Sequence, residues 1–318
     1  MNLFPSHCVV NGFRNTVIQN LVQGKFEVVN NEDLKIHLLP ELPFLINIPS
    51  PTYDIYESPS IITNAIIEVS ISNNLIKKKN LNLLLNILEG CLCKHIVVRF
   101  TTFIDNHRLL ILFKEFKKYN IHSVCILLNY HKEYYNNDFA NAIKYSGCIY
   151  TCIFFKSPFE KNLENLIHFT KSEYKITYNK VLTEFNSNIP LYLEAQKFNT
   201  YFNKKVFISE TGQIKNAPEC SQSFGNVTNL KSLNDLKEIV EDTEFQRFWK
   251  VKKDSCDICQ DCEFRYMCVD NRIPIIRDDR TAYFEKECNY NPYINKWRGE
   301  ENYLSLADLG IFLNNSNS

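Results

Sequence analysis

Five cysteines in the last quarter of the chain are spaced in the way that metal ligands are spaced. They are Cys256, Cys259, Cys262, Cys268 and Cys288. Thiolates this close in sequence, all within 33 residues, can converge on one metal ion or on one iron–sulfur cluster. No histidine occurs after His168, so the pattern predicts an all-cysteine site: an iron–sulfur cluster or a zinc ion with four thiolate ligands. Isolated cysteines such as Cys8 and Cys125 are typical of small core residues.

Composition narrows the classes of protein that could carry such a site. A chain of 318 residues has room for two or three domains. Its formal net charge is zero, which argues against a broad surface for nucleic acid or for an anionic membrane. Residues 1–10 have no pattern of a secretory signal, and no apolar run reaches the roughly 18 residues of a membrane span. We therefore expect a soluble cytoplasmic protein, in which disulfides are disfavoured and clustered cysteines favour metal.

The first segment, residues 1–60, has the pattern of a small β unit followed by a linker. An Asn-Gly turn lies in residues 9–13, and strands are expected at residues 17–21 and 26–29, with Gly24 in the turn between them. Five prolines interrupt residues 40–60, which we expect to form an irregular linker.

Residues 61–204 alternate between strand and helix patterns. Strands are expected at residues 65–71, 95–100, 123–128, 148–155, 174–178 and 191–195, and helices at residues 75–88, 109–119 and 159–169. Such alternation predicts parallel βαβ units. A closed barrel of eight units needs roughly 200 residues or more. The fold class expected is therefore α/β, with a partial or degenerate (β/α) barrel.

After residue 204 the alternation stops. Residues 206–214 have the pattern of a hairpin that turns at Gly212, and residues 229–250 are mostly helical. The cysteine cluster follows, and a last helix is expected at residues 304–313. Residues 205–318 are thus expected to form a cysteine-rich metal domain.

This last third resembles the SPASM domain, the auxiliary iron–sulfur module of radical SAM peptide maturases. The resemblance is carried by the hairpin at Gly212, by Cys220, by the run Cys259-x2-Cys262-x5-Cys268 and by Cys288. Within that class the chain is most similar to the SPASM-domain peptide maturases of "grasp-with-spasm" ribosomal-peptide systems. The phrases that carry this closer likeness are CEFRYMC at 262–268, CNYNPY at 288–293, ITNAII at 62–67 and Cys8-x3-Gly12.

The chain departs from that family where radical SAM chemistry would begin. Radical SAM enzymes carry a CxxxCxxC motif just after the first barrel strand, whereas residues 70–75 of this chain contain no cysteine. Cys91-x-Cys93 has the wrong spacing and lies beyond the next helix. We therefore expect no binding or cleavage of S-adenosylmethionine, and whether the chain is an enzyme at all stays open.

The second departure concerns the number of metal centres. A full SPASM domain holds two clusters, and the resemblance implies that Cys259, Cys262, Cys268 and Cys288 are the ligands of one of them. The other cluster needs a cysteine four residues after Cys268, where this chain has Arg272, and only Cys220 of that ligand set remains. One 4Fe-4S cluster is therefore expected, or one zinc ion. Cys256 lies outside the ligand pattern, and we expect it at the surface.

No other constellation in the sequence indicates catalysis. Acidic pairs such as Asp278-Asp279 are typical of a solvated face. The chain has no GxGxxG, Walker A, GxSxG or HExxH pattern. Arg265 and Tyr266, inside the cysteine run, could either hydrogen-bond cluster sulfurs or a peptide, or only pack the loop.

The function that the resemblance implies is that of an accessory protein in ribosomal-peptide (RiPP) maturation. Such a protein would bind a precursor peptide and a partner ATP-grasp peptide ligase. The N-terminal β unit would bind the leader peptide as an added strand, because an exposed sheet edge is a template for an incoming chain. Two alternatives stay open: a divergent peptide-modifying or redox enzyme that uses the remaining iron–sulfur centre, and a structural four-cysteine zinc protein.

Overall fold

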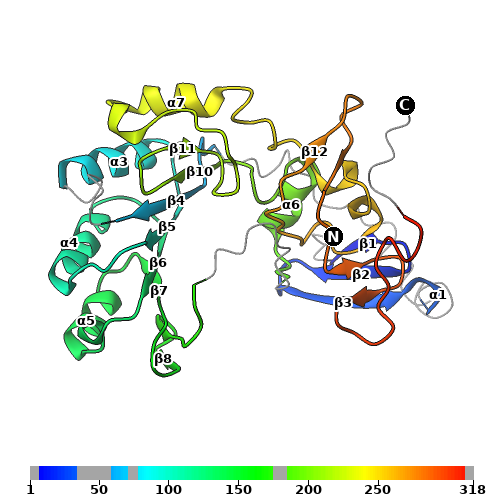
Figure 1. The fold of residues 1–318 in the computed structure, drawn as a ribbon, viewed down its shortest axis with the longest axis horizontal. Helices are drawn as coiled ribbons and strands as arrows, with labels where there is room; N and C mark the ends of the chain where they lie inside the picture. The colour runs from blue at the N-terminus through cyan, green and yellow to red at the C-terminus, as the bar shows by residue number, and fades with distance from the viewer. Residues whose placement is uncertain (1–6, 34–58, 71–77, 175–184, 312–318) are drawn as a thin grey trace, which may run out of the picture. The chain divides into compact units, whose positions relative to one another are not determined.

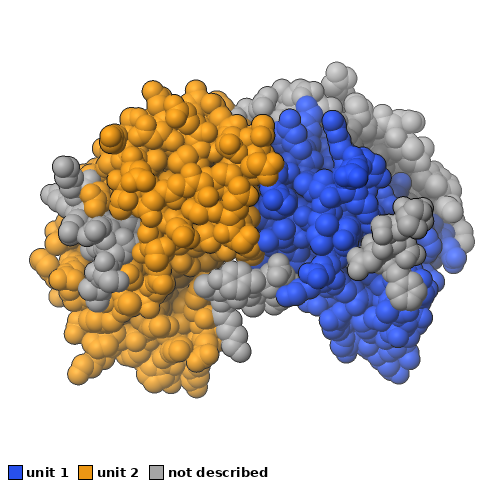
Figure 2. All heavy atoms as spheres, turned by 45° about the horizontal axis from the view of Figure 1, so that its top comes forward, with its two compact units in different colours: residues 1–58, 177–203, 247–318 blue, residues 59–176, 204–246 orange. Residues whose placement is uncertain are grey.

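The computed structural model describes residues 7–33, 59–70, 78–174 and 185–311. The chain divides into two compact units, each assembled from separated segments (Figure 2). Unit 1 comprises Met1–Ser58, Thr177–Asn203 and Arg247–Ser318, and unit 2 comprises Pro59–Ile176 and Lys204–Gln246. This grouping differs from the three consecutive segments expected from the sequence. The reason is that the N-terminal strands and the cysteine-rich segment bury apolar side chains against each other.

Unit 2 is built on an eight-stranded sheet in the order β11-β10-β4-β5-β6-β7-β9-β8. Its strands are β4 (Asn64–Val69), β5 (His95–Phe100), β6 (Ser123–Asn129), β7 (Ile149–Phe155), β8 (Lys161–Leu163), β9 (Ile167–Phe169), β10 (Lys205–Ile208) and β11 (Ile214–Lys215). The six central strands are parallel, and β8 and β11 add antiparallel edges. Within the described residues β8 and β11 do not pair with each other, so the expected α/β sheet is present and does not close into a barrel.

Three helices connect the parallel strands and lie on one side of the sheet (Figure 1). They are α3 (Lys78–Gly90), α4 (Asn106–Phe116) and α5 (Asn137–Lys144), the last preceded by the short 3-10 helix η4 (Lys132–Tyr134). The side chain of Asn136 caps α5 by accepting the Phe139 amide at 2.7 Å. After β11 come η5 (Val227–Asn229) and α7 (Leu233–Glu241), and α7 packs beside α3.

The core of unit 2 follows from the two-residue period of its strands. In β5, Ile96, Val98 and Phe100 are buried, and the two residues between them are only partly buried. A further aromatic cluster closes the β7–β9 end of the sheet, where Phe154 and Phe169 stack with ring centroids 4.8 Å apart. Alternate burial of this kind is expected where helices cover one face of a sheet, because successive side chains of a strand point to opposite faces.

Three secondary-structure predictions were wrong. Residues 159–169, expected as a helix, form the β8–β9 hairpin, because Glu164 and Asn165 adopt left-handed backbone angles, φ 50° and 57°, that turn the chain sharply. Residues 191–195, expected as a strand, lie in α6 (Ile189–Lys197), which Asn188 caps by accepting the Leu191 amide at 2.9 Å. The described part of 304–313 consists of turns instead of a helix. Residues 40–58 and 175–178 lie outside the described residues.

Unit 1 contains a three-stranded antiparallel sheet in the order β1-β2-β3. The strands are β1 (His7–Asn11), β2 (Asn15–Asn20) and β3 (Lys25–Asn30), and they confirm the predicted hairpins. The single turn α1 (Asn31–Asp33) and the helix α6 accompany the sheet. The cysteine-rich segment is largely irregular, with η6 (Lys253–Ser255), η7 (Cys259–Asp261) and the two-residue ladders β12 (Ile275–Ile276), β13 (Ala282–Tyr283), β14 (Tyr290–Asn291) and β15 (Lys296–Trp297).

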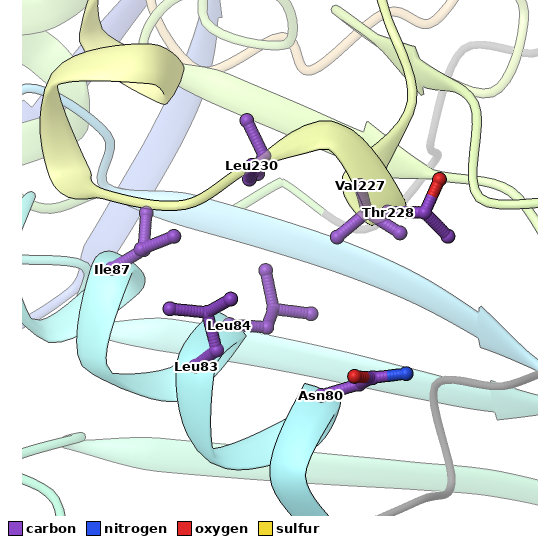
Figure 3. Close-up of a pocket in the computed structure, with 7 residues that line it drawn as sticks. All are labelled: Asn80, Leu83, Leu84, Ile87, Val227, Thr228 and Leu230. Atoms are coloured by element: carbon purple, nitrogen blue, oxygen red, sulfur yellow. The ribbon is translucent and has the colours of Figure 1, made fainter.

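One pocket in unit 2 lies between α3 and η5 (Figure 3). Its lining is mainly aliphatic and includes Leu84, Ile87 and Val227. None of its lining residues is ionisable, so it offers no group for acid–base or metal chemistry. Separately, none of the helices in the described ranges is long and apolar enough to cross a membrane.

Candidate metal centre

The four predicted ligands are presented by irregular backbone in unit 1. Cys259 opens η7, Cys262 caps its C-terminal end, Cys268 follows a short turn, and Cys288 precedes β14. All four are free and partly exposed. The residue before η7, Ile258, has a left-handed φ of 65°, which is rare for a β-branched residue and indicates a tightly constrained knuckle.

The thiols of these cysteines lie close enough to influence one another. Burial raises the pKa of Cys262, Cys268 and Cys288, and the charge of Cys259 raises each of these pKa values further. Within the described ranges, however, no three His, Cys, Asp or Glu side chains already converge as a metal-binding group. The structure therefore brings the four cysteines into one neighbourhood but does not hold their sulfurs in coordination geometry.

A buried charge cluster adjoins the cysteines. Asp270 is fully buried and accepts hydrogen bonds from two cations, Lys253 Nζ and Arg272 Nη2, each at 2.6 Å. The exposed fractions of these two side chains are only 4% and 6%. Burial alone would raise the pKa of Asp270, but the two cations hold it below its ordinary value. The carboxylate is therefore ionised between them.

Both cations act on the predicted ligands. Burial raises the pKa of Cys259, and the charges of Lys253 and Arg272 oppose this rise. In the same way, the charge of Lys253 opposes the rise in the pKa of Cys268, and the charge of Arg272 opposes the rise in the pKa of Cys288. Positive charge at this position favours the thiolate, which is the form that binds metal. The donor set thus fits an all-thiolate centre, which carries negative charge.

The cysteine run packs directly on the N-terminal sheet. The Phe13 amide donates to Asp261 O at 2.8 Å, and Arg265 Nη1 donates to Asn11 O at 2.7 Å. Gly12 lies so close that a Cβ placed there would be 2.7 Å from the backbone nitrogen of Glu263. Val17 of β2 belongs to one apolar cluster that also contains Phe264, Met267 and Tyr290. The β unit and the candidate metal centre are therefore parts of one core.

Glu263 is a buried carboxyl within this contact. It is 0% exposed and accepts a hydrogen bond from the hydroxyl of Tyr290. Burial raises its pKa, and the Tyr290 hydrogen bond opposes that rise. Its position against Gly12 gives it a structural role between the hairpin and the cysteine run.

The expectation that Cys256 lies at the surface was wrong. Cys256 is 0% exposed and packs in an apolar cluster with Val251, Ala282 and Phe284. Its thiol donates to Lys252 O at 3.4 Å, and burial raises its pKa to about 12. These contacts make it a core cysteine next to Cys259, a predicted ligand that packs against the same cluster.

The remaining residues singled out in the sequence have contacts of their own. Arg265 bonds the Asn11 and Cys262 carbonyls, and the Tyr266 hydroxyl donates to Asp254 at 2.9 Å, so both side chains tie the loop together. Cys220 is buried in unit 2, in a different compact unit from the four predicted ligands.

Sequence reasoning did not identify the charge cluster. In the sequence Arg272 marks only the position where a ligand of the second cluster is missing, and Asp270 is separated from it by one residue. That Asp-x-Arg spacing, directly after Cys268, was the available signal. Lys253 lies before the cysteine run and carries no local signal of its partnership with Asp270.

The outer strand β3 of the N-terminal sheet pairs only with β2, so among the described residues its far edge has no partner strand. The bond from the Gly12 amide to Asn15 O, 2.7 Å, marks a hydrogen-bonded pair of the first hairpin. Hydrogen-bonded pairs alternate with non-hydrogen-bonded pairs along antiparallel strands. The odd-numbered residues of β2, such as Asn15, therefore bond the first hairpin, and its even-numbered residues bond β3. The Asn31 amide, which donates to Arg14 O at 2.9 Å, fits this register. In β3 the backbone groups of Phe26 and Val28 therefore point away from β2, along the free edge.

Comparisons with known proteins add little to this geometry. No model of a known protein family matches the chain, and no curated protein sequence matches it. A solved structure described as native anSMEcpe with bound AdoMet and Cp18Cys peptide is similar over 73% of this chain and 94% of that one. The two are 10% identical, with a TM-score of 0.35, and a likeness at that level carries no argument about fold or function.

Proposed function

We propose that this protein is an accessory factor in the maturation of a ribosomally made peptide. In this proposal the β1–β2–β3 sheet binds the precursor peptide as an added strand, and the cysteine run holds one four-cysteine metal centre. The observation that carries the proposal is the free edge of β3, whose outward amide and carbonyl groups match what an extended peptide needs. The ATP-grasp ligase as a partner rests on the resemblance of the cysteine phrases alone.

The peptide site is proposed along β3 because its backbone and its side chains are both accessible. Val28 is 44% exposed, and its amide belongs to the outward set. Phe26, also in the outward set, is partly buried against Phe185 and Phe264, so it can anchor a side chain of the incoming strand. Backbone hydrogen bonds then supply affinity and these apolar residues supply selectivity.

The test uses a fluorescein-labelled leader peptide encoded beside this gene and measures its binding by fluorescence anisotropy. Val28→Pro removes one outward amide without breaking the bonds between β2 and β3, and we expect binding at least tenfold weaker. Val28→Thr is the matched control, because it keeps the amide and the β-branched shape. If Val28→Pro binds as tightly as the wild type, strand addition at β3 is excluded. Val17 is unsuitable for such a test, since it is buried in the central strand.

The metal centre is proposed at Cys259, Cys262, Cys268 and Cys288. Anaerobic reconstitution should saturate near the iron content of one 4Fe-4S cluster, or bind about one zinc ion in air, because thiolates accept both. Single Cys→Ser changes at these four positions should lower the metal content. Cys256→Ala is the control and should keep it, while a Cys256→Ala protein without metal would overturn the assignment. The reconstituted protein should form no 5′-deoxyadenosine from S-adenosylmethionine, since the chain lacks the CxxxCxxC ligands.

A structural zinc protein is the second candidate, favoured by the packing of the cysteine run on the N-terminal sheet. Because Phe13 and Arg265 bond across this contact, a metal that fixes the run would also fix the sheet. In that case a chelator should unfold unit 1, and peptide binding should be absent in every variant. A protein that binds the leader peptide with metal present would favour the maturation role instead.

A further inference from the structure

We infer that Lys253 and Arg272 form a cationic support for the metal centre, neutralising its thiolates from one buried side. This inference rests on the proposed four-cysteine site and assigns it a set of positioning residues. None of the three members of the cluster is a metal ligand in the proposal.

The geometry of the cluster is fixed by Asp270. Its carboxylate accepts Lys253 Nζ at 2.6 Å, and it accepts Arg272 Nε and Nη2 at 2.9 and 2.6 Å. The other arm of the guanidinium donates from Nη1 to the carbonyl of Lys286. Both cations also lie over the ring of Phe284, each 4.3 Å from its centroid. Held on all these sides, neither side chain is free to turn towards solvent.

The charges of the cluster do not balance. Two cations share one carboxylate, which leaves one positive charge in excess. The described residues provide no second acidic partner for either cation in an ion pair. A buried charge without compensation costs several kcal/mol, and proteins usually avoid it. The excess charge is therefore accounted for if the neighbouring cysteines are anionic when the protein is in its working state.

The thiols that the cations reach are the predicted ligands. Asp270, which holds both cations, follows Cys268 by two residues, and the Lys286 carbonyl that Arg272 bonds precedes Cys288 by two. Cys259 packs against the cluster that contains Phe284, the ring that both cations cover. Four thiolates around a zinc ion, or around a 4Fe-4S cluster in its usual oxidised state, carry a net double negative charge. The buried cations offset part of that charge, as outer-shell partners of metal ligands commonly do.

An ordinary buried ion-pair network would predict something different. Such a network stabilises the fold with or without metal, and removing one cation would leave a damaged cluster in both states. Here, removing Lys253 leaves Asp270 and Arg272 as a balanced pair. Removing Lys253 should therefore cost little or no stability in the protein without metal, but it should clearly weaken metal binding.

The experiment compares the full-length wild type with Lys253→Met and with Lys253→Arg. Affinity is measured by titration with Co(II), whose thiolate-to-metal absorption reports the bound ligands, in competition with a chelator. We expect Lys253→Met to bind Co(II) about 10–100-fold more weakly, the range found for outer-shell partners. Lys253→Arg keeps the charge and should bind within a few-fold of the wild type. Without metal, the urea midpoint of Lys253→Met should equal or exceed that of the wild type.

The outcomes separate this inference from the proposed function. If the wild type shows no thiolate-bound Co(II), the proposed metal centre itself fails. If the wild type binds Co(II) and Lys253→Met binds it equally well, the metal centre stands and the cationic support is refuted. A Lys253→Met protein that is less stable or unfolded without metal also refutes it, because the cluster would then be a structural ion-pair network.

Discussion

Replacing Gly12 by alanine should separate the N-terminal hairpin from the cysteine run. The new methyl carbon would lie 2.6 Å from Glu263 Oε2, 2.7 Å from the Glu263 backbone nitrogen and 2.9 Å from Asn15 O. All three distances are shorter than real Cβ contacts, and two of the three atoms belong to the backbone. A rotation of the Glu263 side chain therefore cannot relieve the contact. Either the turn opens or the two segments move apart.

The expected cost follows from what must move. Overpacking a tight contact typically costs about 1–3 kcal/mol. If the segments move apart, the bonds from Phe13 to Asp261 and from Arg265 to Asn11 are weakened, at about 1 kcal/mol each. We expect a total loss of about 3–5 kcal/mol in the free energy of unfolding of unit 1. Gly24→Ala is the matched control. Gly24 has a left-handed φ of 69° and a Cβ contact of only 3.4 Å, so the expected cost is about 1 kcal/mol.

Tryptophan fluorescence can report this loss selectively. The chain has 2 tryptophans, Trp249 and Trp297, and both lie in unit 1. Urea unfolding followed by their fluorescence gives the free energy for the wild type, Gly12→Ala and Gly24→Ala. The usual rule, that glycines with positive φ are the sensitive ones, predicts the reverse order of the two variants. A Gly12→Ala protein as stable as the wild type, or more stable than Gly24→Ala, would refute the packing of Glu263 against the turn.

Three further predictions concern unit 2. Asn136→Ala removes the cap of α5, a bond of 2.7 Å, and should cost about 1 kcal/mol in urea unfolding followed by circular dichroism, with Asn136→Asp as the control that keeps a capping oxygen. Phe169→Ala should cost about 3–5 kcal/mol in the same assay, because this side chain is 1% exposed and stacks on Phe154; a loss below 1 kcal/mol would contradict that packing. A hydrogen bond from the backbone amide of Lys231 is the largest cause that lowers the pKa of Asp235 below its ordinary 3.8. The ionised carboxylate should therefore stabilise the fold fully above pH 3.8. This stabilisation should be lost as the pH falls through the lowered pKa of the folded protein. Asp235→Asn should therefore differ from the wild type near neutral pH and converge with it in acid, and a constant difference across the pH range would rule this out.

Turn chemistry made parts of the fold predictable. The Asn-Gly pair at residues 11–12 and Gly24 located both turns of the N-terminal sheet, and Gly212, with φ 82°, located the turn between β10 and β11. The β8–β9 hairpin was missed because each of its strands has three residues, too few for a two-residue period to show. The start of α6 was missed although Asn188 and Pro190 are a capping residue and a first-turn proline, since the apolar run after them looked extended.

The candidate site was predictable only as far as local spacing reaches. Cysteine spacing predicts that Cys259, Cys262 and Cys268 are neighbours, and in the structure their thiols are close enough to interact electrostatically. Nothing local indicates that Lys253 pairs with Asp270, or that Gly12 meets Glu263 across 251 positions of sequence. Contacts of this kind depend on tertiary packing, which a single sequence read by periodicity does not reveal.

The shared core of Val17 and Phe264 sets an order of events during synthesis. These two residues are 247 positions apart, so the hairpin emerges from the ribosome long before the segment that covers it. At the usual rate of about 5–20 residues per second, the interval is roughly 12–50 s. During that time the apolar face of β2 awaits its packing partners in an incomplete unit. Chains that stop early in the cysteine run would keep this apolar face uncovered, and exposed apolar surface of incomplete chains promotes aggregation.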